Sequence, residues 1–184
     1  MERRRVVVTG VGVVSGAGIG VEAFWKGLSE APPPGPHEVW NWDPEPLIPK
    51  KEHRRLDRFT QFAVVAAHEA METAGSLDSY DPNRVSVGLA TGIGGLESLE
   101  NLIGSAYHSD NPRFSPLWIP MMMCNAAAAA ISIKYGFGGQ ATTPVTACAA
   151  GAQAIIDSMR QIEWGYADAA VAGGTEGAIR APTI

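Results

Sequence analysis

Short apolar runs alternate along this chain with segments that have helical periodicity. Residues 5–14 read RVVVTGVGVV and residues 84–90 read RVSVGLA, and a glycine-rich turn follows each of them. Strands that are apolar almost without interruption are typical of a parallel sheet that is buried on both faces. The alternation therefore predicts an α/β fold, with a mostly parallel sheet covered by helices on both sides.

Three longer segments carry apolar residues at helical spacing, and each stops at a glycine: residues 57–74, 125–135 and 149–164. Further strands are expected at residues 142–146 and 169–172, and a short helix at residues 21–28. The segment from residue 31 to residue 49 contains seven prolines, which exclude a regular helix and predict an extended loop with Trp40 and Trp42 packed against the protein. In such a sheet, the active site is expected at the carboxyl ends of the strands.

Composition limits the classes of protein to which the chain can belong. Its 184 residues are 46% hydrophobic and 18% charged, which predicts one soluble domain over residues 1–184. The formal charge of −5 argues against nucleic-acid binding, because phosphate backbones need a basic surface. Two cysteines are too few for a disulfide framework and favour the cytoplasm. We expect neither a membrane span nor a signal peptide.

The sequence PVTACAAG at residues 144–151 places Cys148 between a strand and a helix. The first backbone N–H groups of a helix have no partner within it and attract negative charge, so this position favours thiolate, the nucleophilic form of cysteine. Small neighbours leave room for an electrophile and an oxyanion. The alternative is a buried cysteine that acts as a small hydrophobic residue. Cys148 is therefore our candidate nucleophile.

Six segments carry a family resemblance. They are VVVTGVGVVSGAG near the start, KKEHRRLDRFTQFAVVAA at 50–67, VSVGLATGIGGLESLE at 85–100, SPLWIPMMMCNAAAAAISIKYG at 115–136, PVTACAAGAQAI around Cys148 and GYADAAVAGGTEGAI at 165–179. In order and spacing they resemble the β-ketoacyl-acyl carrier protein synthases, above all the long-chain elongating (type II) branch and related polyketide ketosynthases. The resemblance implies the thiolase-like fold, with this chain as the first, N-terminal repeat of its layered α/β/α/β/α architecture.

This resemblance also implies a reaction, a decarboxylative Claisen condensation in fatty acid or polyketide biosynthesis. Cys148 matches the family's nucleophile, which accepts an acyl group from an acyl carrier protein before the enolate of malonyl-carrier protein attacks it. The Cys148 backbone N–H matches one half of the oxyanion hole. Ile93 matches a residue that lines the acyl pocket near the dimer partner, although it is equally well an ordinary turn residue. The chain itself needs no cofactor and no metal, because the carrier protein holds the phosphopantetheine.

A basic segment suggests where the carrier protein docks. Residues 50–58 hold five basic and two acidic side chains within an acidic chain. Lys51, Arg54 and Arg55 match positions near the family's docking surface, and a positive patch would attract an acidic carrier protein. The alternative is a solvated helix face that binds nothing.

The family's second half, with two catalytic histidines, a lysine and a glycine-rich FGG segment, has no counterpart in this sequence. The four histidines, His37, His53, His68 and His108, match none of the catalytic positions and are expected to be structural or exposed. We therefore expect this chain to be inactive alone and to be completed by further sequence or by another ketosynthase chain, in a homo-oligomer or a heterodimer.

Three other functions compete with this interpretation. A noncatalytic partner that dimerises or holds the carrier protein would need no reactive thiol, and the glycine turn at 92–95 and the alanine-rich helix at 126–130 would allow its close packing. Chain-length factors, the inactive partners of some ketosynthases, lack the cysteine, so Cys148 argues against that particular role. Dinucleotide binding would use the glycines of residues 9–20, but their spacing does not fit the nucleotide-binding patterns. A thiolase or a chalcone-synthase-like enzyme would share the fold and the cysteine but would use coenzyme A thioesters.

Overall fold

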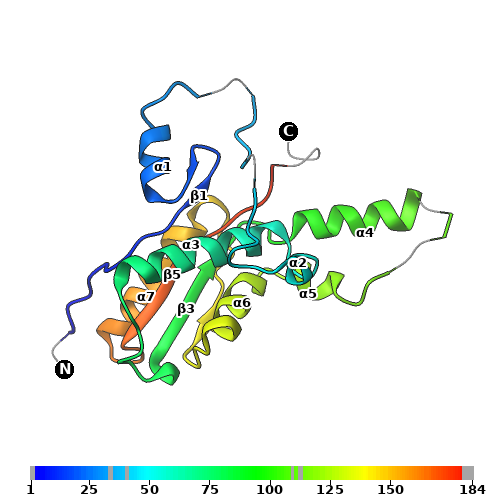
Figure 1. The fold of residues 1–184 in the computed structure, drawn as a ribbon. Helices are drawn as coiled ribbons and strands as arrows, with labels where there is room; N and C mark the ends of the chain where they lie inside the picture. Colours follow the sequence, from blue (N-terminus) through cyan, green and yellow to red (C-terminus); the bar gives the residue numbers. More distant parts are fainter. Residues whose placement is uncertain (1–2, 33–34, 40–41, 109, 112–113, 180–184) are drawn as a thin grey trace.

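A computed structural model describes residues 3–32, 35–39, 42–108, 110–111 and 114–179 (Figure 1). Its centre is a parallel sheet in the order β4-β3-β5, formed by β3 (Val85–Ala90), β4 (Ala141–Thr142) and β5 (Ala169–Gly174). β3 and β5 are in register over their whole length, from Val85 opposite Ala169 to Ala90 opposite Gly174. The predicted parallel sheet is confirmed, and the carboxyl ends of its strands lie at one edge.

Helices cover both faces of this sheet, as expected (Figure 1). The helices α3 (Arg58–Ala74) and α6 (Ala126–Tyr135) pack on one face, and α7 (Ala150–Glu163) packs on the other. Alternation along β3 explains this division, because Val87 and Leu89 join the main core with α3 and α6, whereas Ala90 contacts α7. Gly88 faces α7 so closely that a Cβ there would lie 2.4 Å from the Ser158 hydroxyl.

The three long helices begin and end within one residue of their predicted bounds. Asp57 caps α3 by accepting a hydrogen bond from the Phe59 amide at 3.3 Å, and Gly75 follows its last residue. Gly136 ends α6 in the left-handed conformation, with φ of 70°. The local stop signals in the sequence therefore explain where these helices end.

The expected strand over residues 5–14 is wrong. Only Val14–Ser15 (β1) is a strand in this segment, and it pairs antiparallel with Gly18–Ile19 (β2). The segment lies against α3 instead, because Gly10 and Gly12 are so close to the helix that a Cβ on either would lie 1.9 Å from an α3 carbonyl oxygen. The Val8 side chain is 79% exposed, so this part of the segment is not buried on both faces.

The expected strand over residues 142–146 is also shorter than predicted, since β4 ends at Thr142. Pro144 has no N–H to donate to a neighbouring strand, and the chain turns towards α7 instead. The proline-rich loop is confirmed for the described part of residues 31–49, where no helix or strand occurs. Trp42 packs edge-on against Phe62 at 4.8 Å between ring centroids, whereas Trp40 lies outside the described residues.

The structure adds helices that sequence reasoning did not identify. Two of these added helices are short, α2 (Lys50–His53) and α5 (Trp118–Met122). The third, α4 (Leu96–His108), is longer and projects from the body of the molecule (Figure 1). The expected short helix is present as α1 (Val21–Gly27), and a 3-10 turn, η1 (Pro82–Arg84), precedes β3. In the described part of the chain, no helix combines the length and the apolarity that a membrane crossing requires.

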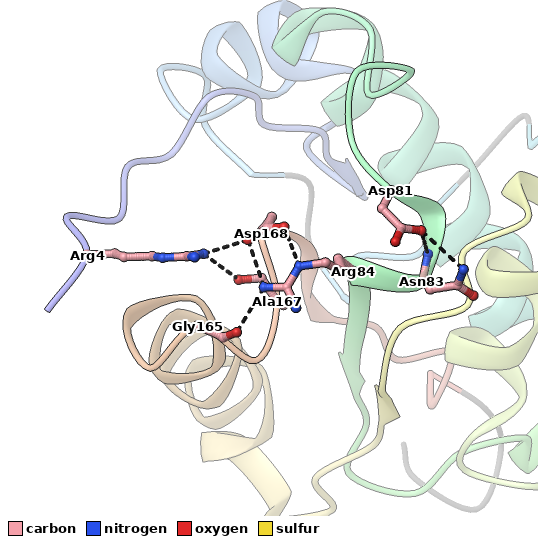
Figure 2. A network of polar contacts seen from close by, with 7 residues as sticks. All are labelled: Arg4, Asp81, Asn83, Arg84, Gly165, Ala167 and Asp168. Carbon is pink, nitrogen blue, oxygen red and sulfur yellow. Dashed lines mark hydrogen bonds and ion pairs between the residues drawn. The ribbon is translucent and has the colours of Figure 1, made fainter. Parts of the chain in front are cut away.

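A polar network joins the start of the chain to the start of β5 (Figure 2). The Asp168 carboxylate accepts hydrogen bonds from Arg84 and Arg4, and Arg84 also donates to the Gly165 carbonyl at 2.9 Å. The hydrogen bonds from Arg84, and then those from Arg4, hold the pKa of Asp168 far below its usual range. These ion pairs fix the amino ends of β3 and β5, at the opposite edge from the candidate site.

Candidate active site

Cys148 lies at the carboxyl edge of the sheet, in a 3-10 turn (η2, Ala147–Ala149) that leads directly into α7. The prediction of a strand-to-helix turn is therefore correct in outline, with one 3-10 turn inserted before the helix. The thiol is free, and the residue is exposed in this chain. The site is accessible to a substrate in this chain.

The backbone immediately before Cys148 is strained. Ala147 has φ of 51°, and it is the one residue other than glycine with a positive φ in the described part of the chain. An L-residue in this conformation costs on the order of 1–3 kcal/mol, and such strain is found mainly at functional sites. The neighbouring packing must hold it in place.

Small residues bring α7 and the sheet close together beneath Cys148. Ala150 and Ala154 are buried against Ala90 at the end of β3. Gly151 of α7 approaches Gly174 of β5 so closely that a Cβ on Gly174 would lie 2.8 Å from the Gly151 Cα. The first turn of α7 therefore lies directly on the ends of β3 and β5, which fixes the place of Cys148.

Ile93 lies in the glycine turn that follows β3, and the structure brings this turn next to the Cys148 turn. A Cβ on Gly92 would contact the Ala147 Cα at 3.7 Å. The Ile93 side chain is 49% exposed. The two turns that the sequence singled out are therefore neighbours, although nothing in the fold alone assigns Ile93 a ligand.

Glu176 joins this site and was not identified from the sequence. One of its carboxylate oxygens accepts hydrogen bonds from the Gly92 amide at 2.8 Å, the Ile93 amide at 3.2 Å and the Thr91 hydroxyl at 3.3 Å. The available signal was an acidic residue two positions beyond the end of a strand that neighbours a glycine turn. Sequence alone could not show that β5 lies beside β3, so the contact was not foreseen.

Asp57 is a second acidic residue that sequence reasoning used only as a helix start. Its carboxylate is buried, and it also accepts a hydrogen bond from the Ser98 amide at 2.8 Å. A single side chain therefore caps both α3 and α4 at their amino ends.

The other cysteine, Cys124, donates to the Ile93 carbonyl with a sulfur–oxygen distance of 3.4 Å.

The basic residues named as docking candidates are exposed. Lys51 lies on α2, and Arg54 and Arg55 follow it. Arg58 is different, because its guanidinium donates to the Val39 carbonyl at 2.7 Å and stacks over the Phe62 ring. Four of the five basic residues of this segment, the three candidates and Lys50, are therefore exposed to solvent, as a docking surface requires.

The histidine best defined by its contacts lies away from Cys148. His68 of α3 is 3.2 Å from the Tyr135 hydroxyl and 3.4 Å from the Glu72 carboxylate. Burial raises the pKa of the Tyr135 hydroxyl above its ordinary value. Across the described ranges, no group of three or more histidine, cysteine or acidic side chains is placed to hold a metal ion.

The fold and the site define an α/β protein with an accessible thiol on a strained turn, where strands of a parallel sheet end. The chain belongs to the β-ketoacyl synthase family, because the model of the family's N-terminal domain matches residues 36–184. Its fold is the thiolase-like fold of these ketosynthases. The resemblance found in the sequence is confirmed.

Curated relatives match nearly the whole chain. The 3-oxoacyl-[acyl-carrier-protein] synthase 2 of Synechocystis sp. is 37% identical over 195 residues, which cover 97% of this chain and 47% of the relative. The enzyme of the same name from Staphylococcus aureus (strain N315) matches at the same identity and coverage, and that from Coxiella burnetii is 36% identical. The chain thus spans about half the length of these relatives.

Solved structures agree. A ketosynthase complex of a type II polyketide synthase with its acyl-carrier protein superposes with a TM-score of 0.84 at 28% identity, over 99% of this chain and 52% of that one. The ishigamide ketosynthase/chain length factor has a TM-score of 0.84 at 26% identity, over 97% and 49% of the two chains.

Proposed function

We propose that this chain is the nucleophile-bearing half of a β-ketoacyl-acyl carrier protein synthase. The observation that carries the proposal is the exposed Cys148 thiol, which follows the strained Ala147 at the carboxyl edge of the sheet. The relatives named 3-oxoacyl-[acyl-carrier-protein] synthase 2 support the same activity. The free cysteines suit a reducing compartment, and we place the activity in the cytoplasm.

The reaction has two covalent stages. The Cys148 thiolate attacks the carbonyl carbon of an acyl thioester on the carrier protein, and the phosphopantetheine thiolate leaves and takes up a proton. A malonyl thioester then loses carbon dioxide, and the carbon of its enolate attacks the Cys148 thioester. The Cys148 thiolate leaves, and the product is a β-ketoacyl chain two carbons longer. The Cys148 backbone N–H, in the 3-10 turn before α7, stabilises the oxyanion.

Exposed apolar side chains just before Cys148 and along α7 support the need for a completing half. Val145 and three residues of α7, Ile155, Ile156 and Met159, are large apolar side chains that are exposed in this chain. Several large exposed apolar side chains on one helix are typical of an interface. The missing catalytic histidines come from the completing half, supplied by further sequence or by another ketosynthase chain.

The acyl carrier protein is the proposed partner. Lys51, Arg54 and Arg55 form an exposed basic group on a chain with a net charge of −5, which suits an acidic partner. A solved neighbour described as a ketosynthase in complex with an acyl-carrier protein supports this assignment.

The experiment is intact mass spectrometry of the native protein, followed by reaction with an acyl-carrier protein or with the epoxide cerulenin. A mass near twice this chain, or a second subunit that copurifies, together with an adduct on Cys148 supports a condensing enzyme. The Cys148→Ser variant should form no adduct and should retain the fold, since the residue is exposed.

The competing proposal is a noncatalytic partner subunit, and the same experiment tests it. A mass that matches 184 residues, with no companion and no adduct, contradicts the enzyme. Iodoacetamide labelling adds a rate, because a scaffold thiol should react like free cysteine whereas an activated one reacts faster.

A further inference from the structure

We infer that Glu176 is a positioning residue that holds Ile93 in place against the Cys148 turn and thereby sets the length of acyl chain that the site accepts. The inference rests on the proposed function and on the expected role of Ile93 as a residue that lines the acyl pocket. Glu176 itself does not touch the reacting atoms in this scheme. It acts through the backbone of the glycine turn after β3.

The hydrogen bonds of Glu176 converge on a single point of that turn. One carboxylate oxygen receives the amides of Gly92 and Ile93 and the hydroxyl of Thr91, at 2.8, 3.2 and 3.3 Å. Consecutive N–H groups that point at one oxygen require a defined backbone shape, and bonds to a charged acceptor are stronger than neutral ones. The carboxylate therefore determines the conformation from which the Ile93 side chain projects.

Glu176 stands on a rigid base. The preceding Thr175 donates its amide to the Ala90 carbonyl at 2.9 Å and its hydroxyl to the Phe59 carbonyl at 2.6 Å. Gly177 after it packs against Phe59, where a Cβ would lie 3.1 Å from the Phe59 amide nitrogen. Phe59 is fully buried in α3, so the carboxylate is anchored to the core on both sides.

The opposite side of the turn is held by weaker, neutral contacts. Cys124 donates its thiol to the Ile93 carbonyl at 3.4 Å, and the Gly95 amide reaches the Met122 carbonyl at 3.3 Å. A thiol is a weak hydrogen-bond donor, and 3.3 Å is long for a bond from an amide N–H to a carbonyl oxygen. Loss of Glu176 would therefore release the Gly92 and Ile93 amides while the turn remained attached at its far end.

The position of the turn bears directly on the Cys148 site. Ala147, which carries the strained φ of 51°, lies beside Gly92. A shift of the turn changes the space between Ile93 and the thiol, and a pocket that gains or loses room for a methylene changes its preference among acyl lengths. Selectivity, more than the ability to form the thioester, is the property that Glu176 controls.

The test compares Glu176→Ala and Glu176→Gln in the native protein, with whatever sequence or subunit completes it. Hydrogen exchange of the peptide over residues 89–96 should become about tenfold faster or more in E176A, because two amides lose a charged acceptor. The ratio of kcat/KM for long and short acyl-carrier substrates should shift by about threefold or more. E176Q keeps an acceptor oxygen and should restore most of both properties.

Asp168→Asn is the matched control. Asp168 precedes β5, and Glu176 follows it. D168N removes ion pairs at the amino end of β5 without touching the glycine turn, so it should lower stability and leave acyl selectivity unchanged. An equal change of selectivity in D168N would mean that general destabilisation is the cause, and the proposal would be overturned.

The remaining outcomes separate this inference from the proposed function. Unchanged exchange in E176A overturns the inference whatever the chemistry of Cys148. Faster exchange with unchanged selectivity in an enzyme that acylates Cys148 also overturns it, since Glu176 is then only structural. If the wild-type protein forms no thioester on Cys148, the proposed function has failed, and the assignment of acyl length fails with it.

Discussion

Ala147 has an unfavourable backbone conformation next to the candidate nucleophile, and its small side chain makes this tolerable. A Cβ branch at a positive φ clashes with the backbone far more than a methyl group does. The position therefore couples the shape of the Cys148 turn to the size of a single side chain, which mutation can probe directly.

We predict that Ala147→Val lowers the free energy of unfolding by about 1–3 kcal/mol and slows acylation of Cys148. Ala147→Gly relieves the strain and should leave stability within about 1 kcal/mol of wild type. Urea denaturation and the rate of thioester formation measure the two effects. Equal stability of the valine variant would show that the turn is not strained in solution.

Asp168 gives a pH dependence whose sign follows from its depressed pKa. A carboxylate whose folded pKa lies below its unfolded value of about 3.9 stabilises the fold above that value, and this stability is lost as the pH falls further. We predict that Asp168→Asn lowers the melting temperature at pH 7 and that the difference from wild type narrows as the pH falls below about 4. A difference that stays constant down to pH 2 would contradict the ion pairs with Arg84 and Arg4.

At the scale of the element, the packing of α7 on β3 depends on the absence of a side chain at Gly88. A Cβ there would meet the Ser158 hydroxyl at 2.4 Å and the Ala154 carbonyl at 3.3 Å. We predict that Gly88→Ala destabilises the protein by about 1–3 kcal/mol in urea denaturation, because α7 must move outward.

Gly104 in α4 is the matched control for this variant, since it is a helical glycine with nothing within 4 Å of an added Cβ. Gly104→Ala should raise stability by about 0.5–1 kcal/mol, the ordinary helix-propensity gain. Destabilisation by both variants would mean that space around the glycine does not determine the effect.

The three basic residues on and just after α2, Lys51, Arg54 and Arg55, are expected to act together as one docking surface. We predict that reversal of Lys51, Arg54 and Arg55 to Glu raises the KM for the carrier protein and that added salt weakens the difference, because the attraction is electrostatic. Reversal of three other exposed basic residues, Arg3, Arg5 and Lys26, is the control with equal charge change. An unchanged KM in the first variant, or an equal rise in the control, would rule out this docking surface.

Local signals explain which elements the sequence could predict. The helices α3, α6 and α7 combine apolar periodicity with glycine stops, and β3 is a buried apolar run bounded by a turn, so each has its cause within its own residues. Residues 5–14 have the composition of a strand, but their glycines fit against α3, a contact that no local pattern encodes. The start of α4 has no local signal of this kind, because the residue that caps its first turn, Asp57, lies 41 positions earlier in the chain.

The candidate site follows the same rule. The place of Cys148 at a strand-to-helix turn could be predicted because its neighbours in sequence create it. Glu176 could not, because its partners at residues 91–93 lie more than 80 positions away and meet it only through the pairing of β3 with β5. Sequence thus indicated the candidate nucleophile but not the residue that shapes its surroundings.

At the scale of the whole molecule, large apolar side chains of α7 are exposed in this chain, as on a surface that another part of a protein covers. We predict that replacing Ile155 and Met159 with Gln makes the 184-residue chain more soluble and less able to bind a hydrophobic dye. The same change should weaken association in the native protein, as measured by subunit dissociation or by melting temperature. If the completed protein is unaffected, this face is not where the completing half binds.

The contact of Arg4 with Asp168 gives the order in which the molecule can be assembled during synthesis. The two residues are 164 positions apart, so Arg4 leaves the ribosome well before the residue to which it bonds. At a translation rate of about 5–20 residues per second, the amino-terminal segment waits roughly ten to thirty seconds for its partner. Until Asp168 is available the segment lacks this ion pair, so its anchoring follows the synthesis of β3, β4 and α7, which all precede Asp168 in the chain.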